Sequence, residues 1–242
     1  MTNTQPAAPP RPPFLGTFPA LMGASLAALL AVGVASAVVL ERRDPGTKVV
    51  DAAEATLGSG SAHLHYRVTG IFSGSTEQEL DADTDFSSRR YVLGGDVDNK
   101  RLEARVIDGT AYLAGSVLDS RLATGKRWLR ITTQAAGTAV PLDQLDPTAV
   151  LAALRDDETG EVTAEGAAKI EGEPMQRYRA TFTREDLPEN ADIYIAADGL
   201  VRRLVYSFRA GNLAGRTVID FSSYGSIVTV NPPNQTEVTD AS

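Results

Sequence analysis

The sequence predicts an α+β protein: a strongly curved antiparallel sheet with short helices packed on its concave side, preceded by an N-terminal apolar helix. Apolar and polar residues alternate with a period of two through much of the stretch from Ser61 to Val230, which is typical of strands with one wet face. Two Asp-Gly dipeptides separate strand-like runs in this stretch. Only one helix within it has clear start and stop signals. We therefore expect mostly local, antiparallel strand connections.

An uncharged stretch from Pro12 to Leu40 dominates the N-terminal part of the chain. A membrane-spanning helix needs roughly 20 mostly apolar residues, so the segment 14–40 is long enough to cross a bilayer. Residues 35–37, Ala-Ser-Ala, have the small-x-small form of a signal-peptidase site, so a signal cleaved after Ala37 is the alternative. We favour a retained single-pass anchor, because the apolar run continues to Leu40 and Arg11 is the only basic side chain ahead of it.

Composition limits what the rest of the chain can be. Of the 242 residues, about 200 follow the apolar segment, which suits one core. Cysteine is absent, which excludes disulfides, thiolate metal sites and a cysteine nucleophile. With 23 basic and 31 acidic residues, the net charge of -8 disfavours nucleic acid as a partner, because phosphate binding relies on clustered Lys and Arg.

The predicted organisation places one domain between polar or flexible segments. Five prolines and few apolar side chains predict a disordered tail over residues 1–13. Residues 41–48 are interpreted as a juxtamembrane linker with a turn at 44–47, residues 49–233 as the domain, and residues 234–242 as a polar C-terminal tail.

Two short helices are expected within the domain. The first ends at Gly58, and its apolar face holds Val49, Val50, Ala53 and Leu57. The second has Asp146 placed to cap it and Pro147 at its first helical position. Its apolar residues recur at helical spacing: Val150, Leu151 and Leu154. Because so short a helix is unstable alone, we expect it to lie on the sheet.

The remaining segments are predicted to be strands. They cover residues 62–71, 76–86, 101–107, 111–113, 127–131, 160–170, 176–183, 193–196, 201–208, 217–223 and 226–230. In 76–86 the acidic side chains take every odd position from Glu77 to Asp85, and Arg101 and Arg105 alternate in 101–107. If these two strands are neighbours, their opposite charges favour one register. Asp108-Gly109 and Asp198-Gly199 predict type I′ hairpin turns.

Five motifs give this order of elements a family resemblance. They are IDGTAYL (107–113), KRWLRI (126–131), LDPTAVLAAL (145–154), IAADGLVRRLVYSF (195–208) and VIDFSSYGSIVTVNPP (218–233). Together with the N-terminal export segment, they resemble the LppX and LprG lipoproteins of mycobacteria over roughly Val49 to Pro233. The resemblance implies a half-barrel shaped like the LolA and LolB carriers, an exterior location, and a cavity holding acyl chains. Ala37 stands where the family has its acylated cysteine, so the lipid anchor cannot form.

The expected function follows from the resemblance. We expect a membrane-anchored cell-envelope protein, with its C-terminal domain extracytoplasmic, that binds or presents the acyl chains of a lipid or lipoglycan. An envelope transporter is a further expected partner, and no cofactor is expected. The alternative is an envelope structural or sensory domain without a ligand, signalling to a partner through its membrane helix. An enzyme is disfavoured, because no nucleophile elbow, His-Glu-x-x-His, phosphate loop or dinucleotide motif occurs.

Alternation assigns one set of side chains to the apolar face, where they would line the lipid cavity. The candidates are Leu64, Tyr66, Val68, Leu80, Ala82, Phe86, Leu102, Val106, Tyr112, Val150, Leu151, Leu154, Tyr178, Phe182, Leu204 and Tyr206. The competing interpretation is that the same residues fill an ordinary closed core.

Other chemistry-bearing residues have ordinary explanations, and no metal site is predicted. His63 and His65 have a spacing that supplies two zinc ligands, but no third ligand is indicated. The acidic run 81–85 mimics a calcium loop, yet Phe86 stands where an EF-hand needs Gly and Val92 where it needs Glu, which favours a solvated strand. Trp128 lies beside basic residues, as at a membrane-facing rim, although a packed strand aromatic is the commoner case.

Overall fold

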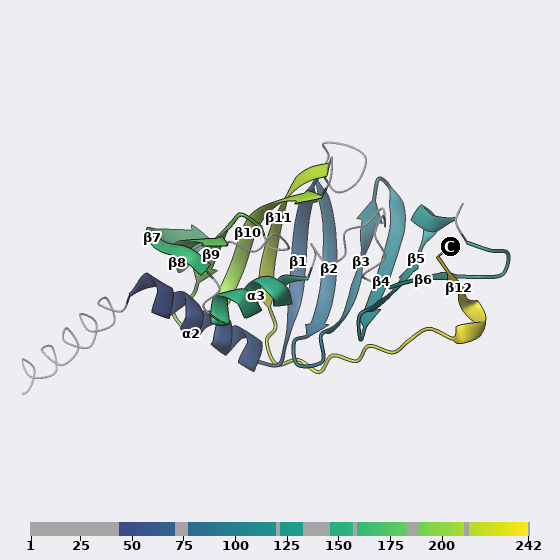
Figure 1. The fold of residues 1–242 in the computed structure, drawn as a ribbon, viewed down its shortest axis with the longest axis horizontal. Coiled ribbons are helices and arrows are strands. Elements are labelled where there is room, and N and C mark those ends of the chain that lie inside the picture. The colour runs from purple at the N-terminus through teal and green to yellow at the C-terminus, as the bar shows by residue number, and fades with distance from the viewer. Residues whose placement is uncertain are drawn as a thin grey trace, which may run out of the picture. The chain divides into compact units, whose positions relative to one another are not determined.

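The structure is a computed structural model that describes residues 44–70, 77–119, 122–132, 146–156, 159–182, 188–210 and 213–241. These residues belong to one compact unit of mostly β structure, and their strands form one 12-stranded sheet with two α-helices beside it (Figure 1). The expected tail (1–13) and apolar segment (14–40) lie outside the described residues. Across the described ranges, every helix is too short or too polar to span a bilayer.

Strands β1 to β6 run from the middle of the sheet to one side, and β7 to β11 run from the opposite edge back to the middle. In chain order they are β1 (Ser61–Thr69), β2 (Gln78–Asp85), β3 (Arg90–Val97), β4 (Lys100–Ile107), β5 (Thr110–Ala114), β6 (Trp128–Thr132), β7 (Thr159–Ile170), β8 (Glu173–Phe182), β9 (Asn190–Ile195), β10 (Val201–Ala210), β11 (Leu213–Ser222) and β12 (Val238–Asp240). Their order in the sheet is β12-β6-β5-β4-β3-β2-β1-β11-β10-β9-β8-β7. Consecutive strands pair antiparallel on both sides of the central β1–β11 pair, as the predicted meander requires.

Strand β3 was not predicted, and it changes the neighbours of the acidic strand. It lies between β2 and β4, pairing Leu80 with Gly95 on one side and Gly95 with Leu102 on the other. The segments 76–86 and 101–107 are therefore not neighbours, and their opposite charges do not face each other across one ladder. Two adjacent glycines interrupt the alternation inside β3, which hid it in the sequence, and Asp98 and Asn99 with positive φ form the turn that follows.

The C-terminal residues differ from their prediction. Residues 226–230, expected as a strand, have no regular structure. The chain instead runs along the ends of the strands to the 3₁₀ helix η3 (Gln235–Glu237) and then to β12; this segment is yellow in Figure 1. Strand β12 pairs parallel with β6. Residues 238–240 of the expected polar tail are thus part of the sheet, and Arg130 pairs with Asp240 across it.

The two Asp-Gly turns differ. Asp108 and Gly109 both have positive φ, as the predicted type I′ turn between β4 and β5 requires. In the turn between β9 and β10, Gly199 has positive φ and its N–H donates to the carbonyl of Ala196. Asp198 keeps negative φ, so this second turn is a longer one.

Both helices form where the sequence places them. Helix α2 (Pro45–Gly58) begins earlier than expected, because Asp44 caps it by accepting hydrogen bonds from the N–H groups of Gly46 and Thr47. The residues expected to form a turn in the linker are therefore the first turn of this helix. Its buried side chains are Val49, Ala52, Ala53 and Thr56, whereas Val50 and Leu57 are only partly buried. Helix α3 (Pro147–Arg155) begins at the predicted cap, with the Thr148 N–H donating to Asp146 over 2.8 Å.

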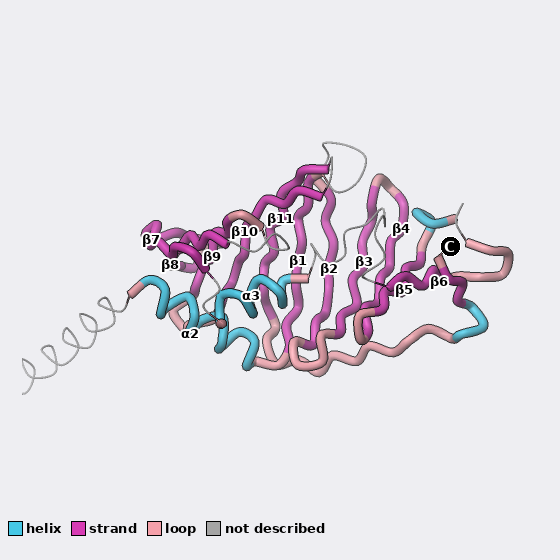
Figure 2. Tube along the Cα trace, viewed as in Figure 1, coloured by secondary structure: helices cyan, strands magenta, loops and turns pink. Residues whose placement is uncertain are grey.

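The helices lie together on one part of the sheet. Helix α2 contacts α3 and the strands β7, β9 and β10, and both helices lie in front of the strands from β7 to β1 (Figure 2). The main core lies between these helices and the sheet, and its buried side chains reach strands on both sides of β1.

Candidate functional site

All but one of the predicted cavity residues gather in one core between the helices and the sheet. All of them are buried, and all except Tyr112 belong to a single cluster built from the helices and the inner face of the sheet. Leu80, Leu151 and Leu154 have no solvent-exposed surface at all. The alternation therefore identified the buried face, and the residues pack against one another in the structure.

Tyr112 lies on the opposite face of the sheet, which corrects its assignment. Its neighbours Ala111 and Leu113 belong to the main cluster, so alternation along β5 turns Tyr112 to the other side. There it packs with Ala114, Trp128 and Val238 in a second, smaller cluster. Trp128 is accordingly a packed strand aromatic, with the Arg105 guanidinium 4.6 Å from the centre of its ring.

Several members of the main cluster were not among the predicted residues. Tyr91 and Leu93 come from the unpredicted strand β3, and Ala104, Ile193 and Ile219 face the same core. The alternation of Tyr91, Leu93 and Val97 around Gly94-Gly95 was the available signal. Together with the predicted residues, they complete a buried apolar face that extends across the sheet to β5 and β6.

Two buried tyrosines, Tyr66 and Tyr206, bring polar groups into this apolar face. Tyr66 on β1 and Tyr206 on β10 are both buried, and Asp146 at the start of α3 lies close enough to interact with each. Burial raises the pKa of both phenols well above the ordinary value of 10.0, and the carboxylate of Asp146 adds to the effect. Both side chains are therefore neutral at physiological pH.

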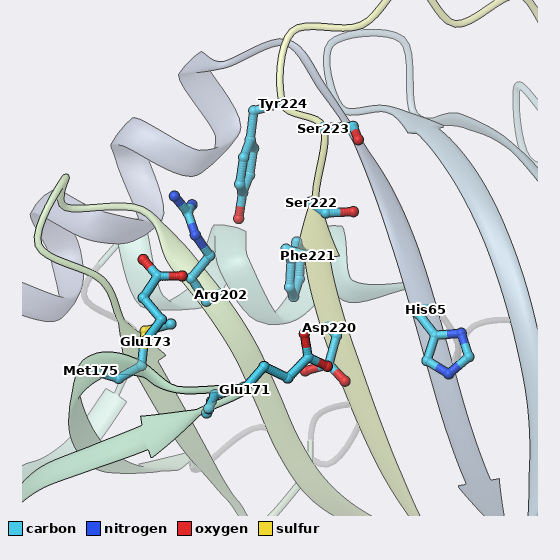
Figure 3. Close-up of a pocket in the computed structure, with 11 residues that line it drawn as sticks. His65, Glu171, Glu173, Met175, Arg202, Asp220, Phe221, Ser222, Ser223 and Tyr224 are labelled. Atoms are coloured by element: carbon cyan, nitrogen blue, oxygen red, sulfur yellow. The ribbon is translucent and has the colours of Figure 1, made fainter.

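Two clefts lie away from the predicted residues. The first, about 510 Å³, has walls from β1, β10, β11 and the turn between β7 and β8 (Figure 3). Figure 3 shows Tyr224 beside Arg202, whose guanidinium carbon lies 5.1 Å from the centre of the tyrosine ring. It also shows Glu171 from the turn and Glu173 from the start of β8. A second cleft of about 420 Å³ adjoins β4, β5 and the 3₁₀ helix η1 (Ser116–Leu118).

Neither cleft suits an acyl chain. Charged side chains contribute to the walls of both, including Asp220 in the first and Arg101 and Glu103 in the second. Burying a methylene chain against charged groups forfeits the hydrophobic gain and strips those groups of water. An acyl chain would instead require the apolar face beneath the helices.

No known protein family and no curated protein matches the sequence. The LppX lipoprotein of Mycobacterium tuberculosis superposes with a TM-score of 0.52 at 18% identity, over 77% of this chain and 98% of LppX. This chain has an LppX-like fold. The resemblance expected from the five motifs is thus confirmed at the level of the fold. This chain contains no cysteine.

Two further structures are similar at lower scores. LprF of Mycobacterium bovis matches 78% of this chain and 96% of its own length with a TM-score of 0.49 at 19% identity. A LolA superfamily protein of Nitrosomonas europaea matches 76% of this chain and 94% of its own length with a TM-score of 0.34 at 7% identity.

Proposed function

We propose that the domain binds or presents the acyl chains of a lipid or lipoglycan, held against the inner apolar face of the sheet. The proposal includes the strong half-barrel curvature expected from the sequence, retention of the apolar segment 14–40 as a membrane anchor, and an extracytoplasmic domain. It assigns no catalytic step.

The observation that carries the proposal is the extent of the apolar face. Helix α2 contacts β7, β9 and β10, but buried apolar residues such as Leu80, Leu93 and Leu102 continue the face across β2, β3 and β4. Each methylene moved from water to such a surface gains roughly 0.8 kcal/mol, so a face of this extent can hold acyl chains. The LppX-like fold agrees with this use of the sheet.

One observation favours the alternative of an envelope structural or sensory domain without a ligand. Leu80, Leu151 and Leu154 are fully buried, as in a core that protein side chains already fill. A carrier with this packing has to separate its helices from the sheet before an acyl chain enters. The two functions therefore differ in whether the face ever holds a guest.

Lipid content is the direct test. The full chain should be purified from membranes in mild detergent, and its organic extract compared by mass spectrometry with that of an unrelated membrane protein prepared in parallel. The proposal expects an acyl-bearing compound in stoichiometric amount in native mass spectra. A parent protein free of bound lipid would favour the ligand-free domain.

Leu151→Trp separates the two functions by volume. If α3 covers a space that admits acyl chains, the added volume should abolish lipid co-purification and lower stability by less than about 1 kcal/mol. In a permanently filled core the same substitution should cost about 1 to 3 kcal/mol through overpacking. Ala152→Trp, on the partly exposed side of α3, is the matched control and should retain both lipid and stability.

Attachment is tested separately. The full-length protein should fractionate with membranes and carry no lipid modification, because the apolar run supplies the anchor and Ala37 removes the acylation site. A soluble species beginning at Val38 as the major form would mean that the segment is a cleaved signal.

A further inference from the structure

The first of the two clefts lies on the outer face of the sheet, away from the main core. His65 on β1 and Asp220 on β11 lie opposite each other in the ladder, and both line the cleft. They alternate with Leu64 and Ile219, which belong to the main core, so their side chains point to the other side of the sheet. Phe221 is the one buried wall residue that the cleft shares with this core. The first cleft is therefore separate from the apolar face proposed for acyl chains.

Tyr224 and Met175 give the first cleft a fixed apolar wall. The Tyr224 hydroxyl donates to the carbonyl of Val201, and the guanidinium carbon of Arg202 lies 5.1 Å from the centre of its ring, so the ring is held at two points. Met175 is 5% exposed, yet it belongs to neither hydrophobic cluster. A ligand in the cleft therefore meets apolar and aromatic surface that the cores leave unused.

Exposed polar side chains from two parts of the chain complete the walls. Glu171 and Glu173 come from the β7–β8 hairpin, and Ser222 and Ser223 come from the end of β11 (Figure 3). Within the described ranges, neither glutamate carboxylate makes a hydrogen bond or an ion pair. The first cleft therefore presents free acceptors together with hydroxyls that both donate and accept.

Two of these polar residues have an unfavourable backbone conformation. Glu171 has a φ of 51° and Ser223 a φ of 49°, in the left-handed region. Asn, Asp and Gly tolerate that region better than Glu or Ser, so neither turn has the residue that suits its backbone best. Residues kept in such conformations cluster at ligand sites, which favours a function for this cleft.

The charges of the walls limit the class of ligand. Asp220 is paired with Arg67 and Arg203, whereas the two glutamates of the hairpin leave uncompensated negative charge. This charge repels phosphates and carboxylates. An ammonium ligand would meet the guanidinium of Arg202, which already makes the cation–π contact with Tyr224. A neutral ligand with many hydroxyls avoids both conflicts.

A neutral carbohydrate fits these groups. Its hydroxyls donate to carboxylates and exchange hydrogen bonds with serines, and the C–H groups of a sugar ring pack on apolar surface. The cleft volume of about 510 Å³ lies within the usual range of small-ligand sites. We propose that the first cleft binds a neutral glycan, with Glu171 and Glu173 accepting hydrogen bonds from its hydroxyls and Tyr224 and Met175 packing against its ring. The site lies across the sheet from the main core, so it does not depend on the proposed lipid binding.

A glycan array tests the proposal. The labelled full chain, kept in a detergent without sugar groups, should be retained by neutral oligosaccharides, and the strongest of these is then titrated calorimetrically in soluble form. Glu171→Asn removes the carboxylate but suits a positive φ, so it should weaken binding about tenfold or more without lowering the thermal unfolding midpoint. Glu173→Gln should also weaken binding. Glu161→Gln, at an exposed position of the same hairpin outside the cleft, is the matched control and should change affinity by less than about twofold.

Three results would overturn the site. The first is an array on which no neutral glycan retains the parent protein. The second is retention by amino sugars or acidic sugars alone, which would mean that charge selects the ligand. The third is equal binding by Glu173→Gln and Glu161→Gln, which would place the glycan elsewhere on the molecule. Lipid co-purification, measured on the same variants, should match the parent, so glycan binding and lipid binding are judged separately.

Discussion

The backbone N–H of Val201 on β10 donates a hydrogen bond to the side-chain hydroxyl of Thr56 on α2 over 3.0 Å, and both residues are fully buried. The bond lies where the register between β9 and β10 shifts, between Val201 and Arg203. A register shift leaves a ladder group without its regular strand partner, and here a helix side chain replaces that partner. The bond joins α2 to the sheet at one defined point.

Thr56→Val should therefore be destabilising although it preserves shape. It removes the acceptor and leaves the buried Val201 N–H unsatisfied, which should lower the free energy of unfolding by about 1 to 3 kcal/mol. Equilibrium unfolding in urea measures the change. Thr47→Val, an exposed position of the same helix, is the control and should stay within about 0.5 kcal/mol of the parent. Equal effects at both positions would contradict the role of the bond.

Gly95→Ala should be far more disruptive than the same change one residue earlier. A Cβ atom at Gly95 would lie 2.6 Å from the carbonyl oxygen of Glu79 and 2.6 Å from Cδ2 of Leu80, so β2 or β3 must shift. We expect a loss of about 1 to 3 kcal/mol in thermal or urea unfolding. At Gly94 the nearest atom is 3.8 Å away, so Gly94→Ala should be close to neutral. A neutral Gly95→Ala would mean that the two strands are less tightly apposed than described.

Val238→Ser should release the C-terminal strand from the outer cluster. Val238 packs with Trp128, which is 2% exposed and is the only tryptophan of the chain. Because β12 has three residues and β6 as its partner in the sheet, loss of this contact should detach it. Tryptophan emission should then move to longer wavelength, and acrylamide should quench it more strongly. Thr239→Ser, at the neighbouring position, should leave the emission as in the parent.

Buried phenols should make the protein unstable in alkali. The raised pKa of Tyr66 keeps it neutral in the folded state, whereas in the unfolded chain it ionises near its ordinary pKa of 10.0. This contribution to stability is therefore complete below pH 10 and lost as the pH rises toward the folded-state pKa. Thermal unfolding midpoints should fall above pH 10, less steeply in Tyr66→Phe. Ionisation of all seven tyrosines before any unfolding would contradict the burial.

Much of the local structure follows from short-range rules. Asp146 and Pro147 predict the start of α3 because they satisfy and pre-form the first turn, and Asp108-Gly109 predicts its hairpin because both residues tolerate positive φ. Residues 226–230 alternate too, but they find no partner strand among the described residues. Alternation alone does not supply hydrogen-bond partners.

The sequence predicted which residues are apolar and buried, but it did not always predict on which side of the sheet they lie. Leu64, Leu80 and Leu204 were placed correctly on the buried apolar face, because their strands have one polar face. Tyr112 was misplaced, because β5 is apolar on both sides and its alternation carries no information about which side is the main core. The alternation likewise gave no sign of the aspartates that face His63 and His65, since they belong to another strand.

By itself, the sequence determined most of the local features: the period of most strands, the helix caps, the tight turn at Asp108 and the acidic side of β2, all of which depend on residues a few positions apart. The tertiary structure decided which elements meet. It inserted β3 between β2 and β4, joined β1 to β11 across more than half of the domain, and placed β12 parallel to β6. Such pairings join residues far apart in the sequence and depend on the apolar surface that the whole chain buries, which a local sequence pattern does not predict.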